Sequence, residues 1–290
     1  MRLALTHRTV YAYDDDVTAS YGLGLLTPRE LAHQHVVEHV IDVRPAPADL
    51  RHDVDLHGNT LTYLQIDTPH RELVVEACGV VETRPPVTDL PALADPWEDA
   101  RPSRRRDVAD AWRALDFALA SPSIAHSERA VAYARESLAP GRPLGEAALE
   151  LMGRIHDDFR YDPEATSVTA TVDDLLSAGA GVCQDFAQLM LAGLRGHGLA
   201  ARYVSGYLAT DPPPGKARVL GADATHAWVE VWVPGDGWLA LDPTNDQPAN
   251  ERYVTVGWGR EYAEVPPLKG VIYTEATTST LSVAVDVVPA

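Results

Sequence analysis

Three residues of this sequence have the side chains and the surroundings that a thiol nucleophile needs. Cys183 stands at a glycine-rich break, GAGVCQDFAQL, directly before a helix-like pattern of apolar residues. His226 opens the strand-like run HAWVEVWV, and Asp242 closes the run GWLALD. A thiol, an imidazole and a carboxylate are the nucleophile, its base and the group that orients the base in cysteine-dependent acyl transfer. We therefore take Cys183, His226 and Asp242 as the candidate catalytic residues.

The expected positions of these side chains favour a reactive thiolate. A free thiol is mostly protonated at neutral pH, because its ordinary pKa is about 8.5. If Cys183 opens a helix, its sulfur faces unpaired N–H groups and the positive end of the helix dipole. If His226 lies within hydrogen-bond reach, a thiolate–imidazolium pair becomes the favoured state, and Asp242 accepts the other ring N–H.

The spacing of His226 and Asp242 predicts that the two side chains meet. Their runs are joined by Pro234-Gly235-Asp236-Gly237, which has the composition of a tight turn. In such a hairpin the first residue of one strand and the last residue of its neighbour lie level at one end of the sheet.

The composition is that of a globular, water-soluble protein. The 290 residues are 46% apolar and 23% charged, with a net charge of −18 at pH 7. This acidic balance argues against nucleic-acid and anionic-membrane partners, because both require a basic face. No stretch reaches the roughly 18 apolar residues of a membrane span, and the opening MRLALTHRTVYAY does not resemble a signal peptide. Two cysteines, Cys78 and Cys183, do not make a disulfide framework, so we expect a cytoplasmic protein.

Changes of pattern divide the chain into three regions. Residues 1–84 read as strands with a turn at His57-Gly58-Asn59, which predicts an antiparallel β-sandwich-like or barrel-like domain. Residues 85–103 are rich in proline and predict a surface linker. Residues 104–290 predict helices first and antiparallel strands afterwards, including the last two strand-like runs, GVIYTEA and TLSVAVDVV. The predicted fold class is therefore α+β.

Four helices are expected in the third region. The first two have an apolar face, formed by Val108, Trp112, Leu115 and Leu119 in one and by Leu144, Ala148, Leu151, Met152 and Ile155 in the other. Thr171 is a plausible N-cap of the third, followed by two aspartates and later by a glycine. The fourth starts at Cys183 and ends at Gly196 or Gly198.

Several neighbours of the candidate residues have less certain roles. The N–H of Cys183 would supply one donor for a developing oxyanion, and Gln184 or Tyr161 either supplies a second or simply packs. Trp228 should share a sheet face with His226 and either shields it or is ordinary core. Asp185 is expected to cap N–H groups or to pair with an arginine such as Arg202, and not to catalyse.

No motif predicts a metal or a cofactor. The sequence contains no G-x-S-x-G, H-E-x-x-H, paired C-x-x-C or phosphate-binding glycine loop. His33, His35 and His39 are close in sequence, but solvent-facing histidines on an open sheet explain them better than a metal site does. We therefore expect neither a cofactor nor a metal.

The candidate residues lie in segments that resemble a known family. The segments GVCQDFAQLMLAGLRGHGLAARYVSGYL and THAWVEVWVPGDGWLALDPTN closely resemble the transglutaminase-like (papain-like cysteine hydrolase) superfamily, in its bacterial branch with an N-terminal β domain. The opening YAYDDDVTASYGLGLLTPRE, the hairpin DLHGNTLTYLQID and the segment GREYAEVPPLKGV also resemble that branch. The resemblance implies a papain/transglutaminase-like core of helices packed on an antiparallel sheet, with a triad of Cys183, His226 and Asp242.

The expected function is cysteine-dependent acyl transfer on peptide or isopeptide amide bonds through a thioester. We expect a hydrolase, that is a protease or amidase, because water is always present whereas an amine acceptor needs its own site. The alternative is a protein-glutamine transglutaminase that crosslinks its substrates. The second alternative is a non-catalytic peptide-binding module with a retained triad. The expected partner is a protein or peptide substrate, and the sequence does not indicate an oligomeric state.

Overall fold

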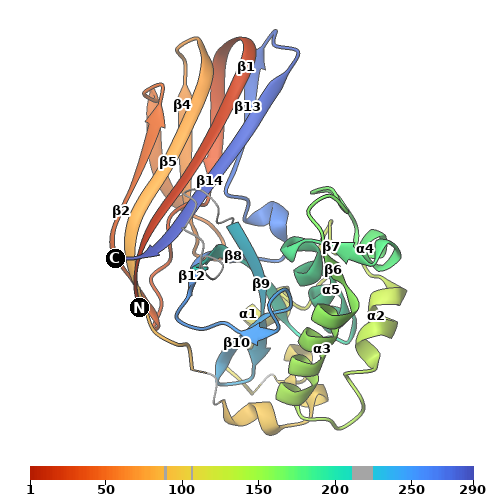
Figure 1. The fold of residues 1–290 in the computed structure, drawn as a ribbon. Helices are drawn as coiled ribbons and strands as arrows, with labels where there is room; N and C mark the ends of the chain where they lie inside the picture. The colour runs from red at the N-terminus through yellow and green to blue at the C-terminus, as the bar shows by residue number, and fades with distance from the viewer. Residues whose placement is uncertain (88–89, 106, 211–224) are drawn as a thin grey trace, which may run out of the picture.

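A computed structural model describes residues 1–87, 90–105, 107–210 and 225–290 (Figure 1). A tall antiparallel sheet holds both ends of the chain, and a second, smaller sheet lies between it and a group of helices (Figure 1). The predicted α+β class is confirmed, with helices next to an antiparallel sheet.

The tall sheet is organised around one long strand. Its sequential strands are β1 (Arg2–Gly24), β2 (Gln34–Arg44), β3 (Asp49–Val54), β4 (Thr60–Ile66) and β5 (His70–Thr83). The first half of β1 pairs with β5, and its second half pairs with β4. A register shift between Ala12 and Val17 separates the two halves, so one strand pairs with two different neighbours within one curled sheet.

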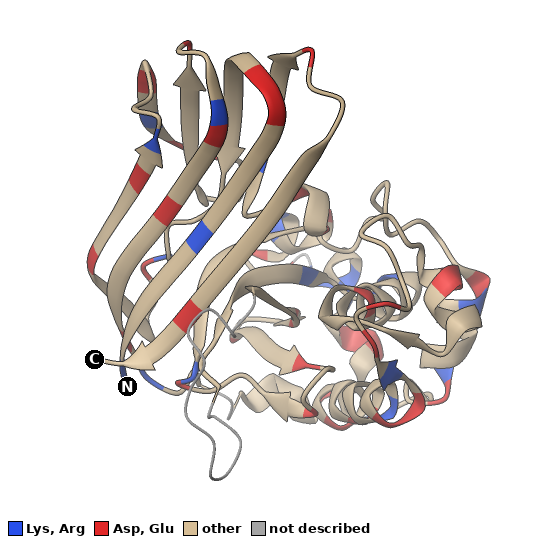
Figure 2. Ribbon diagram, turned by 45° about the horizontal axis from the view of Figure 1, so that its top comes forward, with Lys and Arg blue, Asp and Glu red and all other residues tan. Residues whose placement is uncertain are grey.

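Alternation of side chains explains why β1 and β5 form a half-buried layer. Leu3 and Leu5 point into the core, whereas Arg2 and Arg8 point to the other face and lie opposite Glu82 and Glu76 of β5. Figure 2 shows acidic and basic residues spaced along these strands, and the four paired side chains are 30–53% exposed. That side of the sheet therefore faces solvent.

The last two strands of the chain correct the sequence analysis, which placed them in the third region. Strands β13 (Leu268–Thr274) and β14 (Ser279–Pro289) both pair with β1 and belong to the tall sheet. Val285 and Val287 of β14 are buried beside Leu3 and Leu5. Strand periodicity alone does not name a partner strand, so the pairing of the two chain ends was not visible in the sequence.

The proline-rich segment is also more ordered than a linker. Its described residues form three short 3-10 helices, at Pro91–Ala94, Trp97–Ala100 and Pro102–Arg104. Trp97 is buried, and its indole N–H donates to the carbonyl of Ala139 (2.9 Å). Proline starts two of these helices, at a position where its missing N–H has no cost. Because Trp97 is buried, the segment packs on the core and is not a solvent-exposed linker.

The first predicted helix is shorter than expected and turns a different face inward. It is α1 (Ala111–Asp116), and Trp112 and Leu115 of the predicted apolar face are exposed. Ala111, Ala114 and the following Phe117 are buried instead, against Trp232. The small side chains of Ala111 and Ala114 let α1 approach the large indole of Trp232 closely. This packing decides which face of the helix is buried, although the opposite face has the larger apolar side chains.

Three of the remaining helices follow the sequence prediction. They are α3 (Leu144–Asp158), α4 (Val172–Ala178) and α5 (Cys183–Gly196), whereas α2 (Glu128–Arg135) was not predicted from the sequence. The five apolar residues predicted for α3 are all buried. Thr171 caps α4 through a capping box with Asp174, and Gly179 ends that helix with a positive φ of 66°. No helix among the described residues is long and apolar enough to cross a membrane.

The second sheet supports α5. Its order is β11 (Gln247–Pro248), β10 (Gly237–Asp242), β9 (Thr225–Val233), β8 (Ala201–Leu208) and β12 (Tyr253–Gly259), all antiparallel. The predicted hairpin of β9 and β10 is confirmed, with Gly237 opposite Val233. Separately, the two-residue strands β6 (Arg160–Tyr161) and β7 (Ala180–Gly181) pair in parallel just before α5.

Two buried carboxamides join the tall sheet to the edge strand β12. Gln34 donates to the carbonyl of Thr255 and accepts from its N–H, both at 2.8 Å. Asn59 does the same for Trp258, at 2.8 and 3.0 Å. An unpaired edge strand leaves N–H and C=O groups without partners, and here side chains replace the missing neighbouring strand.

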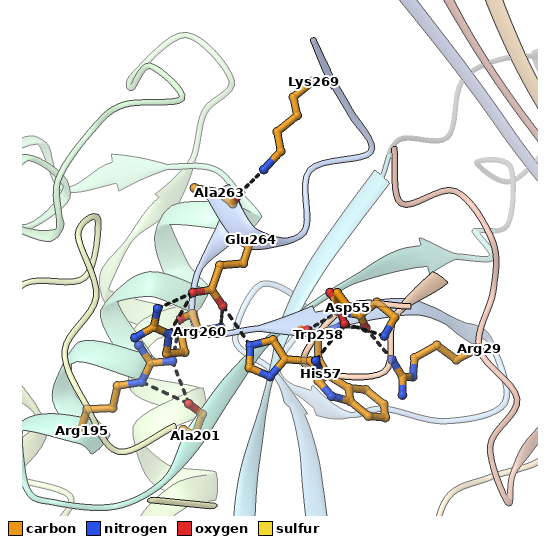
Figure 3. Close-up of polar contacts among 11 residues, drawn as sticks. Arg29, Asp55, His57, Arg195, Ala201, Trp258, Arg260, Ala263, Glu264 and Lys269 are labelled. Carbon is orange, nitrogen blue, oxygen red and sulfur yellow. Dashed lines mark hydrogen bonds and ion pairs between the residues drawn. The ribbon is translucent and has the colours of Figure 1, made fainter. Parts of the chain in front are cut away.

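A polar cluster around the last 3-10 helix, Tyr262–Glu264, strengthens the same junction (Figure 3). Glu264 accepts from Arg260 (2.9 Å) and from His57 of the β3–β4 turn (3.2 Å). Burial raises the pKa of Glu264, but these hydrogen bonds outweigh burial and hold that pKa at about 2. Arg195 of α5 donates to the carbonyls of Arg260 and Ala201, so the cluster reaches from the tall sheet to the end of α5.

We predict that Gln34→Leu destabilises the whole protein. The substitution leaves the N–H of Thr255 buried without its acceptor, at a cost of about 1–3 kcal/mol, whereas the carbonyl of Thr255 still accepts from the N–H of Arg29 (3.0 Å). Urea unfolding measures the free energy change. The control is Gln65→Leu on β4, where the side chain binds Asp67 at an exposed site. Equal stability of the two variants would contradict this role for Gln34.

Candidate active site

Cys183 is the first residue of α5, as the sequence predicts. Val182 before it is extended, and β7 delivers the chain to this point alongside β6. The side chain is partly buried and the thiol is free. The first N–H groups of a helix have no partner within it, so the sulfur lies where a negative charge is favoured.

Asp185 fixes the start of this helix. Its buried carboxylate accepts from the N–H of Val182 (2.9 Å) and from the hydroxyl of Thr166 (2.6 Å). Gly181 allows this approach, because a Cβ there would come within 2.7 Å of the Asp185 carboxylate. Of the two roles weighed for Asp185, capping is the one observed, whereas Arg202 pairs with Glu230 instead.

His226 and Asp242 meet at one end of the second sheet. His226 lies at the start of β9, Asp242 is the last residue of β10, and His226 Nε2 donates to Asp242 Oδ2 at 2.7 Å. The imidazole is 11% exposed and the carboxylate is fully buried. The hairpin therefore brings the two side chains together as its spacing predicts.

Asp242 is held as a carboxylate by more donors than His226 alone. Its Oδ2 also accepts from the hydroxyl of Tyr253 (2.6 Å) and the amide of Asn245 (2.7 Å). Its Oδ1 accepts from the backbone N–H groups of Thr244 (2.8 Å) and Asn245 (3.3 Å). Burial raises the pKa of Asp242, but the hydrogen bonds from His226, Asn245 and Tyr253 lower this pKa by more than burial raises it. The carboxyl group therefore stays charged.

The charge state of His226 depends on both of its neighbours. Burial lowers the pKa of His226, whereas the hydrogen bonds and negative charges of Asp242 and Cys183 raise it to about 10. The imidazole is thus protonated at neutral pH when Cys183 is a thiolate. The structure brings sulfur, ring and carboxylate into one interacting set, in the order that the sequence analysis expected.

Aromatic rings cover the side of the imidazole away from solvent. The ring of Trp228 stacks on His226 with centroids 6.2 Å apart, and Tyr253 lies 6.1 Å from the same imidazole. Gly206 pairs with His226 on the neighbouring strand, and a Cβ at that glycine would come within 2.6 Å of the Trp228 ring. Trp228 and His226 therefore lie on the same face of the sheet, as the sequence analysis predicts.

The two residues considered as further oxyanion donors differ in position. Gln184 donates to the carbonyl of Val168 (3.0 Å) and so ties a neighbouring loop to α5. Tyr161 is 54% exposed, and burial and then the charge of Cys183 raise the pKa of its hydroxyl. Tyr161 thus lies within electrostatic reach of the sulfur, whereas the amide of Gln184 is already bonded.

Sequence reasoning missed the supports of Asp242 and two tyrosines near Cys183. Asn245 stands in the quoted segment DPTN, three residues after Asp242, and this Asp-x-x-Asn spacing was the available signal. Tyr253 had no such signal, because it reaches Asp242 from β12, a strand that the sequence analysis did not identify. Tyr203 and Tyr262 lie near enough for the charge of Cys183 to raise the pKa of each, after the larger effect of burial.

The histidines of the tall sheet have ordinary surroundings. His35 is exposed beside Glu30, as the sequence analysis expected. His33 and His39 are half-buried, whereas they were expected to face solvent. Within the part of the chain that the structure describes, no three His, Cys, Asp or Glu side chains are grouped to hold a metal ion.

The pairing of His226 with the sulfur predicts the outcome of a titration. In Cys183→Ala the thiolate is absent, so the pKa of His226 should fall from about 10 toward the usual range. NMR of the imidazole nitrogens as the pH is raised measures this value. Cys78→Ala is the matched control and should leave it unchanged. An unchanged His226 titration in Cys183→Ala would show that the sulfur and the ring do not interact.

Comparisons with known proteins agree with this geometry. The bacterial transglutaminase-like N-terminal region matches residues 3–82, and the transglutaminase-like superfamily matches residues 131–243. An uncharacterized protein of Mycobacterium tuberculosis is 48% identical over 296 residues, covering 99% of this chain and 93% of its own. A protein-glutamine gamma-glutamyltransferase of Pseudomonas aeruginosa is 34% identical over 152 residues, which are 51% of this chain and 22% of that protein.

The fold has a solved counterpart. A crystal structure of a candidate cysteine protease from Cytophaga hutchinsonii superposes with a TM-score of 0.70 over 98% of this chain and 90% of its own, at 18% identity. At that identity the likeness concerns the fold alone. The sequence matches and the common fold show that this chain belongs to the transglutaminase-like superfamily, in the branch with a bacterial N-terminal region.

Proposed function

We propose that this protein is a cysteine-dependent hydrolase of peptide or isopeptide amide bonds, with Cys183 as nucleophile, His226 as acid and base, and Asp242 as the group that orients His226. One observation carries the proposal. The ring of His226 donates to a fully buried carboxylate on one side and interacts with the sulfur of Cys183 at a helix start on the other. Membership of the transglutaminase-like superfamily supports a cysteine-dependent activity in general.

The acylation step follows from these positions. Because Nε2 of His226 is bonded to Asp242, Nδ1 is the ring nitrogen left for the sulfur. The Cys183 thiolate attacks the amide carbonyl and forms a C–S bond. The C–N bond breaks as the imidazolium gives its proton to the leaving amine, and a thioester remains.

The deacylation step restores the starting state. Neutral His226 takes a proton from water, and the resulting hydroxide attacks the thioester carbonyl. The C–S bond breaks, an acid is released, and the thiolate again faces an imidazolium. The Cys183 N–H at the start of α5 is positioned as one donor to the oxyanion of both steps.

The competing proposal replaces water by an amine. The local similarity to the Pseudomonas aeruginosa gamma-glutamyltransferase favours it, since that match includes about half of this chain. In that case an amine attacks the thioester and the products are joined. We favour hydrolysis, because water needs no site of its own, and we keep the cytoplasm as the proposed compartment because both cysteines are free thiols.

A peptide and acyl-amine library tests the proposal with mass spectrometry as the readout. The wild-type protein should release hydrolysed products, and Cys183→Ala should release none while keeping its fold. Asp242→Asn should slow turnover by about 100-fold or more, because the imidazole loses its orienting acceptor. Joined products would favour the transglutaminase alternative. If the wild type releases no product, the peptide-binding alternative is favoured. If Cys183→Ala keeps full activity, another residue is the nucleophile.

A further inference from the structure

Three donors share one oxygen of the Asp242 carboxylate. Oδ2 accepts from His226 Nε2 (2.7 Å), from the side-chain amide of Asn245 (2.7 Å) and from the hydroxyl of Tyr253 (2.6 Å). The carboxylate is fully buried, so solvent does not weaken these bonds. The imidazole therefore shares its acceptor oxygen with two neutral groups.

A chain of hydrogen bonds fixes the Tyr253 hydroxyl as a donor to Asp242. Gln247 Nε2 donates to the hydroxyl oxygen (2.8 Å), which leaves the hydroxyl proton for Asp242. Burial, and then the charge of Asp242, raise the pKa of Tyr253, so the phenol keeps this proton at neutral pH. Hydrogen bonds in a chain polarise one another, so the Gln247 amide strengthens the bond that Tyr253 donates.

The ring of Tyr253 is held by packing that does not depend on its hydroxyl. Tyr253 is 3% exposed, and its ring lies edge-on to Trp228 with centroids 5.3 Å apart. The same ring lies 6.1 Å from the imidazole of His226. Two residues further along β12, Gln34 bonds to both backbone groups of Thr255. Tyr253→Phe should therefore keep the position of the ring and remove only the hydroxyl.

The acylation step requires His226 to release a proton that the site holds tightly. Burial lowers the pKa of His226, but the hydrogen bonds and charges of Asp242 and Cys183 raise it to about 10. A general acid is most effective when its pKa is near the pH of the reaction. A neutral donor that takes part of the charge of Oδ2 weakens the attraction between Asp242 and the imidazolium.

Other titratable groups do not take this part. Among the described residues, those that contact His226, Asp242 or the turn after β10 are Cys183 of α5, Tyr253 of β12 and His156 of α3. The ring of His156 bonds to the backbone carbonyl of Thr244 (2.9 Å), and Cys183 adds negative charge to the site. Gly206, opposite His226 on β8, has no side chain. Tyr253 is thus the titratable group that bonds to Oδ2 while it stays neutral.

We propose that Tyr253 is a positioning residue for the acid step, which shares Oδ2 of Asp242 with His226 and so keeps the imidazolium able to protonate the leaving amine. This inference rests on the proposed function and adds one residue to its machinery. The proton passes from His226 to the amine, and Tyr253 keeps its own proton throughout.

The test measures the acidity of the imidazolium in proteins that lack the thiol. NMR of the imidazole nitrogens follows the titration of His226 in Cys183→Ala and in Cys183→Ala combined with Tyr253→Phe. The second protein should hold the ring proton about threefold more tightly, because the lost hydroxyl leaves more of the charge of Oδ2 to the ring. A residue that only supports the structure would have the opposite effect, since a loosened pair of His226 and Asp242 lowers the pKa of His226.

Tyr63→Phe in the same background is the matched control, because the Tyr63 hydroxyl donates to Gln65 within β4 (3.1 Å), and the His226 titration should not change. Gln247→Leu is a second variant in case Tyr253→Phe folds poorly, and it should shift the titration in the same direction by less. A pKa of His226 that is unchanged or lower in a folded Tyr253→Phe protein would overturn the proposal. Failure of the proposed function reads differently: the wild type would release no product from the peptide library, whereas the titration needs neither the thiol nor a substrate.

Discussion

The fully buried carboxylate of Asp242 is the constraint on which the rest of the site depends. A charge without water must be compensated locally, and here His226, Tyr253, Asn245 and the backbone of Thr244 all donate to it. Three of these donors come from the turn after β10 and from β12, so the carboxylate has a fixed position before any substrate arrives. His226 is then the one donor that also faces the nucleophile. The orientation of the ring, and with it the pairing with Cys183, follows from the burial of Asp242.

The tall sheet is linked to this arrangement through β12. That strand carries Tyr253, which donates to Asp242, and it is an edge strand whose free backbone groups are taken by Gln34 and Asn59. The N-terminal strands therefore complete the sheet that holds the triad. The chain returns through β13 and β14 to β1 and so closes the connection from the other end. One continuous apolar core includes residues of both parts.

Much of the site could be predicted because its parts are marked by local sequence. Cys183 follows a glycine-rich break, and His226 and Asp242 stand at the two ends of a hairpin with a recognisable turn, so local rules place all three. Periodicity likewise gave the buried face of α3 and the ends of α4. What failed were the long-range choices. The buried face of α1 is decided by Trp232 from a distant strand, and the partner of β14 is β1 at the other end of the chain. Tyr253 acquires its role only from a neighbour that the fold supplies, the carboxylate of Asp242.

The most direct test of the central claim is the titration of His226 when its buried acceptor loses its charge. The account predicts that Asp242→Asn lowers the pKa of His226 from about 10 toward the ordinary range, because the ring loses the hydrogen bond and the negative charge of the carboxylate. NMR of the imidazole nitrogens as the pH is raised measures this value. An unchanged His226 titration in Asp242→Asn would contradict the account.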